Sequence, residues 1–478
     1  MDAEEFRKRG KEMVDYIADY LSSIEKRRPL PDVEPGYIEE LVRNEAPVEP
    51  DSWEDLMKDI EPIIMKGTTH WHNPNFHAYF PTGNSFPSNL GDMLSAALGC
   101  VGFTWASSPS CTELEVVVMN WLGKMLSLPP EFLFSPKGDG GGVILSSASE
   151  VTLTCLLAAR AKFIRQIKGN NPNMQDGVII SKLISYTSDQ AHSSVEKASL
   201  LGAVNMRILE SDNTGAFRGD TLMKAIKADK AKGLVPFFVC ATLGTTGCCA
   251  FDKLNELGPI CEREGIWLHI DASYAGSSFI CPEFRPLLDG VEYATSFNFS
   301  PHKWLQVNYD CSTVWVKDSR LLSKAFVVDP LFLKHEHEGF MPDYRHWHIP
   351  LGRRFRSLKI WFVLRLFGQK KLQELILKDV NLAKEFEKLV RADDRFEVTS
   401  EVTMGLVCFR FKGTNEKNEK LLKLINDDGR IHIVPATMKG TYYLRFVICA
   451  ATTSIDHVVY AWNVIQEVVK NITTCDIQ

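Results

Sequence analysis

The chain has 478 residues, of which 45% are hydrophobic and 24% charged, and its formal net charge is −6. That length and apolar fraction suffice for a large core and predict one major domain with smaller companions. The sequence has no basic block and no run of like charges, so neither nucleic acid nor an anionic membrane surface is expected as a partner. Small molecules are the expected ligands.

The N-terminus and the cysteines bear on the cellular compartment. The first residues are acidic where a secretory signal would be basic, and no stretch approaches the roughly 20 apolar residues that span a bilayer. The twelve cysteines are scattered without a Cys-x-x-Cys pair, which argues against a zinc site or a disulfide framework. We therefore expect a cytoplasmic protein with reduced thiols and no membrane attachment.

The N-terminal region predicts an arm. Residues 1–28 place apolar side chains at helical spacing with charges on the other face, which is typical of an amphipathic helix. A proline-rich stretch follows, and it predicts extended chain before a helix near 52–66. An arm that cannot bury itself packs on something else, so we predict a homodimer in which residues 1–85 pack on the partner subunit.

The middle of the chain predicts an α/β fold with a mostly parallel sheet. Strand-like apolar runs alternate with helical patterns, and such alternation is typical of a sheet covered by helices on both faces. The predicted large domain spans 86–360, and a different pattern of strands and helices predicts a small C-terminal α/β domain over 361–478. The strand-like runs of the large domain are 142–145, 177–180, 235–239, 266–270 and 313–316.

An acid and an amine follow the ends of two strand-like runs, one of them listed above and the other a short run at 297–299. One apolar run ends on Asp271, and the short run 297–299 leads to Lys303. Because the carboxyl ends of parallel strands meet at one edge of a sheet, the acid and the amine are expected on the same rim. Pyridoxal phosphate needs both groups: an amine for a Schiff base, and a carboxylate that keeps the pyridine nitrogen protonated. Taken alone, an Asp at a strand end is more often a helix cap, and a Lys in a loop is more often a solvated charge.

Four further residues complete the predicted cofactor site. Ala148 and Ser149 open a helix after a strand, where backbone N–H groups and the helix dipole favour a phosphate. The alternative for this serine is a helix cap on a core helix. His192 follows another strand and could stack on the pyridine ring, and Thr246 could contact the ring edge or the histidine.

A metal site was the competing interpretation of the histidine pairs. His335 and His337 lie close in sequence to His346 and His348, but no carboxylate accompanies them at a spacing that suits a metal. We expect no metal.

A long series of motifs links the chain to a known family. The segments concerned are 78–82, 102–105, 111–115, 188–193, 269–271, 301–304 and 343–356. Through them the chain resembles the group II pyridoxal-phosphate decarboxylases, and within these the aromatic L-amino acid decarboxylases. The resemblance implies the type I aminotransferase-like fold, an obligate dimer, Lys303 as the Schiff-base lysine, Asp271 as the pyridinium partner and His192 as the stacking residue. Ser273, Ser300 and His302 are further cofactor-binding candidates, although related sequences usually have Ala and Asn where this chain has Ser273 and Ser300.

The same resemblance suggests the substrate. Histidine decarboxylases are similar to one another in having Ser where this chain has Gly352, and glycine leaves room for an aryl ring. Aromatic and small side chains would line the pocket for a phenolic or catechol substrate such as L-DOPA. Without the family, these aromatic residues would be read as ordinary core. The substrate candidates are Trp71, Tyr79, Phe80, Pro81, Thr82, Val101, Phe103 and Gly352.

Two residues point to different products. Amine-forming members carry a loop tyrosine that looks like the acid for the substrate α-carbon, and this chain has Phe332 there, which cannot donate a proton. At segment 82–87 and at Phe332 the chain resembles the insect 3,4-dihydroxyphenylacetaldehyde synthases. Those enzymes use dioxygen and release an arylacetaldehyde, ammonia, carbon dioxide and hydrogen peroxide. His192 instead resembles the amine-forming decarboxylases. The prediction is aldehyde synthesis alongside amine formation; the alternatives are a simple decarboxylase, an aminotransferase and a catalytically silent binding protein.

Overall fold

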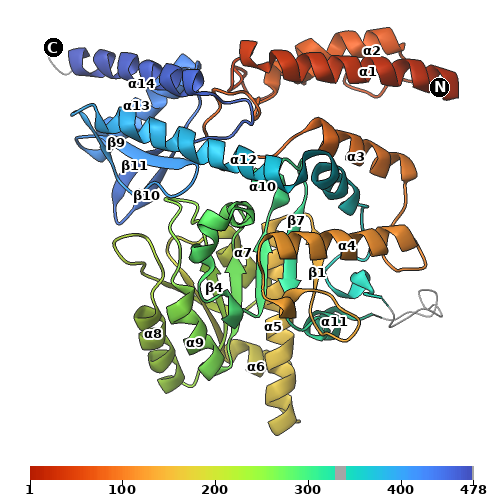
Figure 1. Cartoon of the computed structure of the whole chain (residues 1–478), viewed down its shortest axis with the longest axis vertical. Coiled ribbons are helices and arrows are strands. Elements are labelled where there is room, and N and C mark those ends of the chain that lie inside the picture. The colour runs from red at the N-terminus through yellow and green to blue at the C-terminus, as the bar shows by residue number, and fades with distance from the viewer. Residues whose placement is uncertain (329–340, 476–478) are drawn as a thin grey trace. The chain divides into compact units, whose positions relative to one another are not determined.

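The computed structural model describes residues 1–328 and 341–475, and the side chains among them up to residue 470 (Figure 1). The chain forms two compact units. One contains residues Met1–Pro81, Leu382–Thr399 and Val407–Gln478, and the other contains Thr82–Asn381 and Ser400–Leu406. We call them the terminal unit and the central unit. The division into 1–85, 86–360 and 361–478 stays a prediction.

The central unit is built on a seven-stranded sheet in the order β1-β7-β6-β5-β4-β2-β3. The neighbours from β6 to β3 are parallel, whereas β7 is antiparallel to both β6 and β1. The predicted mostly parallel α/β sheet is confirmed. Its strands are β1 (Gly141–Leu145), β2 (Leu183–Ser188), β3 (Asn205–Leu209), β4 (Val235–Thr242), β5 (Trp267–Asp271), β6 (Ser296–Phe299) and β7 (Ser312–Val316).

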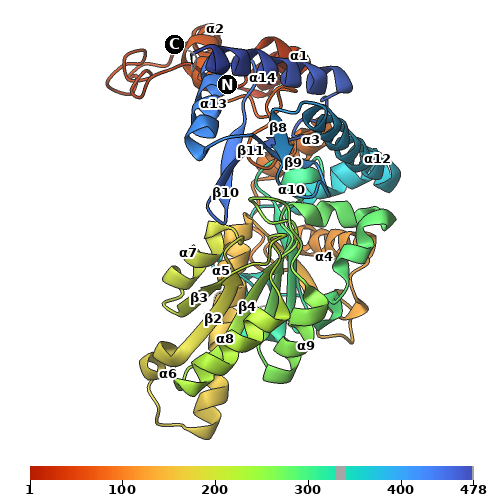
Figure 2. The same ribbon diagram turned by 90° about the vertical axis from the view of Figure 1, so that its left-hand side faces the viewer.

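Helices cover both faces of this sheet, as the two views show (Figures 1 and 2). Helix α5 packs on α7 and across five strands. Helix α8 packs on α9 and on the strands β3 and β4, and α9 packs on β4 and β5. Every residue of β1, β2, β5, β6 and β7 is buried, as expected for strands that helices cover on both faces of the sheet. The helices are α3 (Phe86–Leu98), α4 (Pro109–Met125), α5 (Ala148–Asn170), α6 (Asp176–Lys182), α7 (Ser193–Leu201), α8 (Gly219–Ala231), α9 (Leu254–Glu264), α10 (Pro301–Trp304), α11 (Arg320–Phe326) and α12 (Ser357–Arg391), which breaks at Gly368 and continues into the terminal unit.

One predicted strand is wrong. Residues 177–180 lie in helix α6, and the strand of this region is β2, which begins at Leu183. A run of four apolar residues fits a short helix as well as a strand, because periodicity cannot separate the two at that length.

The terminal unit pairs the N-terminal helices with a small sheet in the order β10-β11-β9-β8. Helix α1 begins after Asp2, whose carboxylate accepts hydrogen bonds from the N–H groups of Glu4 and Glu5, and none of its residues is buried. The helix predicted over 52–66 changes to π and 3-10 turns after Asp59. The elements are α1 (Ala3–Ser23), α2 (Trp53–Asp59), β8 (Phe396–Val398), β9 (Leu406–Phe411), α13 (Asn415–Asp428), β10 (Val434–Met438), β11 (Thr441–Val447) and α14 (Ile455–Cys475).

The cysteines lie mostly in the interior. Of those that the structure describes, all are free thiols and all but Cys100 are buried. Burial raises the pKa of the Cys155, Cys261 and Cys311 thiols to about 12. Over the described part of the chain, no helix has the length and apolarity to cross a membrane.

A glycine sets the spacing between the ends of β5 and β6. Gly276 lies in the 3-10 helix η5 (Ala275–Ile280), and its N–H donates to the Ala272 carbonyl at 2.7 Å. A Cβ at this position would lie 2.3 Å from the Phe299 Cβ and 3.2 Å from the Ala272 Cβ. Both neighbouring atoms are attached directly to the backbone, so only glycine allows this approach.

We expect Gly276→Ala to lower the free energy of unfolding by about 1–3 kcal/mol, because the added methyl group overpacks the contact between the two strand ends. Gly169→Ala is the matched control: a Cβ at this helical position meets nothing within 4 Å, and alanine there should be neutral or stabilise by up to about 1 kcal/mol. Denaturant unfolding of both variants measures the difference, and equal stabilities would contradict the packing argument.

Candidate active site

The ends of β5 and β6 bring an acid and an amine to one edge of the sheet. The two strands are parallel, and Asp271 is paired with Asn298. Beyond the strands the backbones stay paired, since the Ala272 N–H donates to Asn298 at 2.9 Å and the Ser300 N–H donates to Ser273 at 3.1 Å. Lys303 follows in α10, whose single turn is closed by its N–H to the Ser300 carbonyl at 2.9 Å.

Asp271 is poised to accept a proton-bearing group. The residue is only 3% exposed, and the N–H (3.0 Å) and the hydroxyl of Ser273 both donate to its Oδ1. Its Oδ2 accepts no hydrogen bond from the described residues. One free carboxylate oxygen, held rigid by the other, fits the pyridinium N–H of a bound pyridoxal ring. Ser273 thus holds the Asp271 carboxylate in place.

The N-terminus of α5 can hold a phosphate. Ser147 is the capping residue: its Oγ accepts from the Glu150 N–H at 3.3 Å. The N–H groups of Ala148 and Ser149 lie in the first turn, where a helix offers no internal acceptor. The helix cap is thus Ser147 and not Ser149, and the phosphate contact of Ala148 and Ser149 stays a prediction.

Ser300 and His302 lie beside the amine and have protein partners. The Ser300 Oγ is 2.9 Å from the Ser312 Oγ, and the His302 Nδ1 accepts from the Cys311 N–H at 2.9 Å. Burial, together with the positive charge of Lys303, lowers the pKa of His302 to about 3. His302 is thus neutral, with its proton on Nε2. Direct cofactor contacts by these two side chains stay predictions.

His192 is brought into the electrostatic field of both Asp271 and Lys303. Desolvation by neighbouring protein atoms, and then the charge of Lys303, lower its pKa, while Asp271 opposes that shift. The residue is the N-cap of α7: Nδ1 accepts from the Ser194 N–H at 3.1 Å and lies 2.8 Å from the Ser194 Oγ. Since Nδ1 is an acceptor, the neutral ring carries its proton on Nε2.

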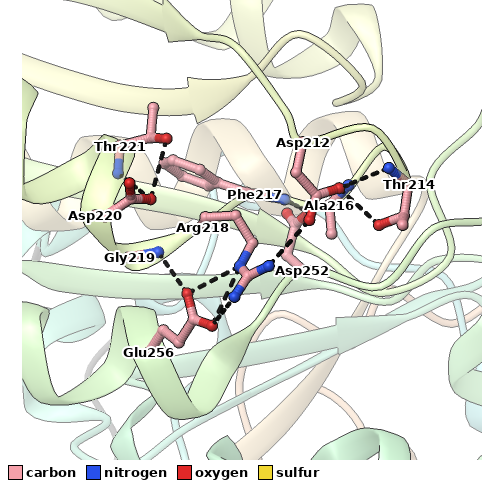
Figure 3. A network of polar contacts seen from close by, with 10 residues as sticks. All are labelled: Asp212, Thr214, Ala216, Phe217, Arg218, Gly219, Asp220, Thr221, Asp252 and Glu256. Atoms are coloured by element: carbon pink, nitrogen blue, oxygen red, sulfur yellow. Dashed lines mark hydrogen bonds and ion pairs between the residues drawn. The ribbon is translucent and has the colours of Figure 1, made fainter.

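The loop that carries Thr246 is closed by a buried acid that the sequence did not reveal. Asp252 is 3% exposed and accepts from the Thr242 N–H at 2.6 Å. It also accepts from the Phe217 N–H at 2.8 Å (Figure 3). Burial raises its pKa to about 7 although both hydrogen bonds oppose the shift. Thr246 itself is half-buried. An acid with two backbone partners far apart in sequence gives no local signal.

Four substrate candidates lie in the central unit. Val101 and Gly352 are neighbours: a Cβ on Gly352 would lie 3.6 Å from the Val101 Cγ1, an ordinary contact, and the Gly102 N–H donates to the Arg353 carbonyl at 3.0 Å. The Phe103 carbonyl accepts from the Arg345 N–H at 3.3 Å. Thr82 precedes Gly83, whose N–H donates to the His302 carbonyl. The structure therefore brings the segment with Val101 and Phe103 next to the segment with Gly352. It places Thr82 next to the turn that carries Lys303.

A buried ion pair anchors this segment, and sequence reasoning missed it. The Arg353 Nη2 lies 2.5 Å from the Glu115 Oε1, and both side chains are buried. The Arg353 guanidinium also lies 4.6 Å from the centre of the Tyr344 ring. Gly352 is thus fixed by the residue that follows it.

The other four substrate candidates lie in the terminal unit. The Trp71 and Tyr79 rings stack at 5.1 Å, and Tyr79 is 49% exposed. Phe80 and Pro81 are buried, and the Arg445 guanidinium lies 5.0 Å from the Phe80 ring. Phe332 lies outside the described residues, as do His335 and His337.

The described residues contain no group of three His, Cys, Asp or Glu side chains that could hold a metal. The site instead combines an acid, an amine, a histidine and a helix N-terminus at one edge of a mostly parallel sheet. This combination defines a pyridoxal phosphate protein of fold type I.

Comparison with known proteins gives the family. A model of the pyridoxal-dependent decarboxylase conserved domain matches residues 35–412. The chain is 59% identical over 474 residues to the aromatic-L-amino-acid decarboxylase of Mus musculus, with 99% of both chains covered. It is also similar to the solved structure of Oryza sativa TDC with PLP and tryptamine, with a TM-score of 0.95, 37% identity and 99% of both chains covered. Rhodiola rosea 4-hydroxyphenylacetaldehyde synthase gives a TM-score of 0.92, with the same identity and coverage.

The chain belongs to the pyridoxal-dependent decarboxylase family, which confirms the resemblance seen in its motifs. It is a carboxy-lyase, and its cofactor is pyridoxal phosphate.

If Lys303 carries the cofactor, borohydride reduction should fix the phosphopyridoxyl group on the peptide that contains it, and Lys303→Arg should abolish this adduct, because guanidinium forms no stable imine. Lys359→Arg is the matched control: Lys359 is a buried lysine that pairs with Asp92 at 3.6 Å, and its replacement should leave the adduct in place. Mass spectrometry of the digest identifies the peptide. An adduct that persists in Lys303→Arg would refute the assignment.

Proposed function

We propose that this protein decarboxylates aromatic L-amino acids, with L-DOPA as a substrate. Part of the substrate reacts with dioxygen and water in the same turnover to give an arylacetaldehyde, carbon dioxide, ammonia and hydrogen peroxide, and the rest gives the amine. The observation that carries the decarboxylation is the placement of Asp271 and Lys303 on adjoining strand ends, with His192 close enough for its pKa to respond to both charges. The name of the Mus musculus relative supports the aromatic substrate.

Each site residue has a distinct task in this proposal. Pyridoxal phosphate, when bound, supplies an electron sink for the electron pair released as carbon dioxide leaves. Lys303 holds the cofactor through its amine until the substrate amine replaces it. Asp271 keeps the ring nitrogen protonated through its free Oδ2, and the N–H groups of Ala148 and Ser149 hold the phosphate.

The pocket for the aryl group would be built from the candidates described above. Gly352 adds no side chain, Val101 is 48% exposed and available for contact, and Phe103 is half-buried on the same segment. A wall of this kind suits a flat aromatic ring because it offers apolar area without crowding. Thr82, in the same unit, is proposed to contribute its hydroxyl group. Trp71, Tyr79, Phe80 and Pro81 of the terminal unit stay substrate-contact candidates.

Two observations bear on the product. Phe332 cannot protonate the substrate α-carbon, which favours reaction with dioxygen and release of the aldehyde with ammonia and hydrogen peroxide. The structural similarity to a plant 4-hydroxyphenylacetaldehyde synthase agrees with that chemistry. His192 retains an N–H at Nε2 that can donate a proton, which supports simple decarboxylation to the amine as the second candidate function.

Product analysis separates the two candidates. With L-DOPA we expect carbon dioxide release to exceed dopamine formation, and oxygen uptake with hydrogen peroxide to account for the difference. A boiled sample and an anaerobic sample serve as controls. Carbon dioxide matched by dopamine, without oxygen uptake, would leave only the simple decarboxylase, and a protein without bound pyridoxal phosphate or turnover would leave the silent binding protein.

We expect His192→Asn to raise the aldehyde-to-amine ratio at least about tenfold, because it removes the Nε2 proton donor. Asparagine is a good N-cap, so its side chain can still accept from the Ser194 N–H and helix α7 should keep its stability. His192→Ala removes donor and cap together and should cost about 1 kcal/mol of unfolding free energy as well. The aldehyde-to-amine ratio formed from L-DOPA is measured for each variant and for the parent protein. The same ratio in the Asn variant and the parent protein would exclude His192 as the donor.

We also propose a cytoplasmic homodimer. Helix α1 buries none of its residues, and α3 exposes an apolar stripe that a second subunit would cover. Light scattering at micromolar concentration tests this, and a monomeric mass would refute it. The exposed residues of α3 are Phe86, Leu90, Met93, Leu94 and Leu98.

A further inference from the structure

Trp304, the residue after Lys303, is fixed by a buried acid from a distant helix. Its indole is 3% exposed, and Nε1–H donates to the Asp379 Oδ2 at 2.9 Å. Asp379 lies on α12 and is itself 3% exposed. The turn that carries Lys303 is therefore attached to α12 through one side-chain hydrogen bond.

The same indole also contacts the segment that carries Asp271. The Tyr274 ring stacks on Trp304 with the ring centres 4.8 Å apart and an angle of 15° between the planes. Tyr274 lies three residues after Asp271, and Trp304 lies one residue after Lys303. The stacked pair thus connects the two chain segments that bear the acid and the amine.

Helix α12 also contacts the segment that follows Asp271. The Gln373 Nε2 donates to the Ile280 carbonyl at 2.7 Å, at the end of the 3-10 helix that begins after Tyr274. Asp379, six residues further along α12, holds Trp304. One helix therefore contacts both segments.

A carboxylate at this place is costly to bury. The nearest cation is Lys378, whose Nζ lies 3.8 Å from the Asp379 Oδ1, and the Oδ1 accepts no hydrogen bond from the described residues. Burial raises the pKa of Asp379 to about 7, while the Trp304 hydrogen bond and Lys378 lower it. An apolar residue would avoid this cost, so the acid is retained for its contact with the indole.

We infer that Asp379 is a positioning residue that acts through Trp304 to fix the amine of Lys303 relative to the Asp271 carboxylate. This inference rests on the proposed roles of Lys303 and Asp271. Helix α10 is a single turn of four residues and cannot hold a lysine rigidly by itself. When the acceptor is removed, the buried indole N–H must find another partner, and the stack on Tyr274 tilts with it.

The test compares variants of the holoenzyme. We expect Asp379→Ala and Trp304→Phe each to lower kcat about 10- to 100-fold with little change in KM, because the reacting groups are displaced and substrate contacts are not. Each should also change the circular dichroism of the bound cofactor and raise its dissociation constant. Asp379→Asn keeps an acceptor oxygen and should stay within about threefold of the parent protein in kcat. The double variant Asp379→Ala, Trp304→Phe should be no worse than either single one, since both remove the same bond.

Ser296→Ala is the matched control. The Trp267 Nε1–H donates to the Ser296 Oγ at 2.8 Å, at the opposite end of β6. This variant also leaves a buried indole N–H without its acceptor, so it should lose thermal stability. It should retain the parent kcat and the cofactor dichroism, because it does not touch the turn that carries Lys303.

The outcomes are distinguishable. If Asp379→Ala and Trp304→Phe keep the parent kcat and cofactor dichroism while their melting temperatures fall, Asp379 has only a structural role and the inference is overturned. Should Asp379→Ala not fold, Trp304→Phe, which keeps a buried ring, decides the question. A borohydride adduct of the parent protein on a peptide without Lys303 would instead overturn the proposed function on which the inference rests.

Discussion

The parallel pairing of β5 with β6 is the constraint on which the rest of the site depends. It fixes the end of one strand against the end of the other, and the backbone bonds of Ala272 and Ser300 extend the pairing into the loops. Because β7 is antiparallel to both β6 and β1, the end of β1 also reaches this edge and delivers the N-terminus of α5. The backbone pairing of the strands therefore determines where the acid, the amine and the N-terminus of α5 lie.

Sequence reasoning found the parts of the site that follow from strand ends. The buried strands around Asp271 and Lys303 are short, apolar and bounded by polar residues, so their ends could be located and the rim predicted. The class of fold followed from the same alternation. The run 177–180 failed because four apolar residues do not carry a period, and the helix near 52–66 was interrupted because Pro62 lies within it.

The residues that sequence reasoning missed share a physical cause. Asp252, the Glu115–Arg353 pair and Asp379 are charged side chains whose partners are distant in sequence: 238 residues separate Glu115 from Arg353, and 75 separate Trp304 from Asp379. A charged residue in a helix is ordinarily solvated, and nothing in its local pattern tells when it is buried. Such pairs become visible only when the fold brings them together.

The buried thiols described above have a chemical consequence for how the protein meets an oxidant. Peroxide attacks the thiolate and hardly the thiol. Burial keeps the described interior thiols protonated, because it raises the pKa of Cys155, Cys261 and Cys311 to about 12. The described interior therefore offers an oxidant few reactive sulfur atoms.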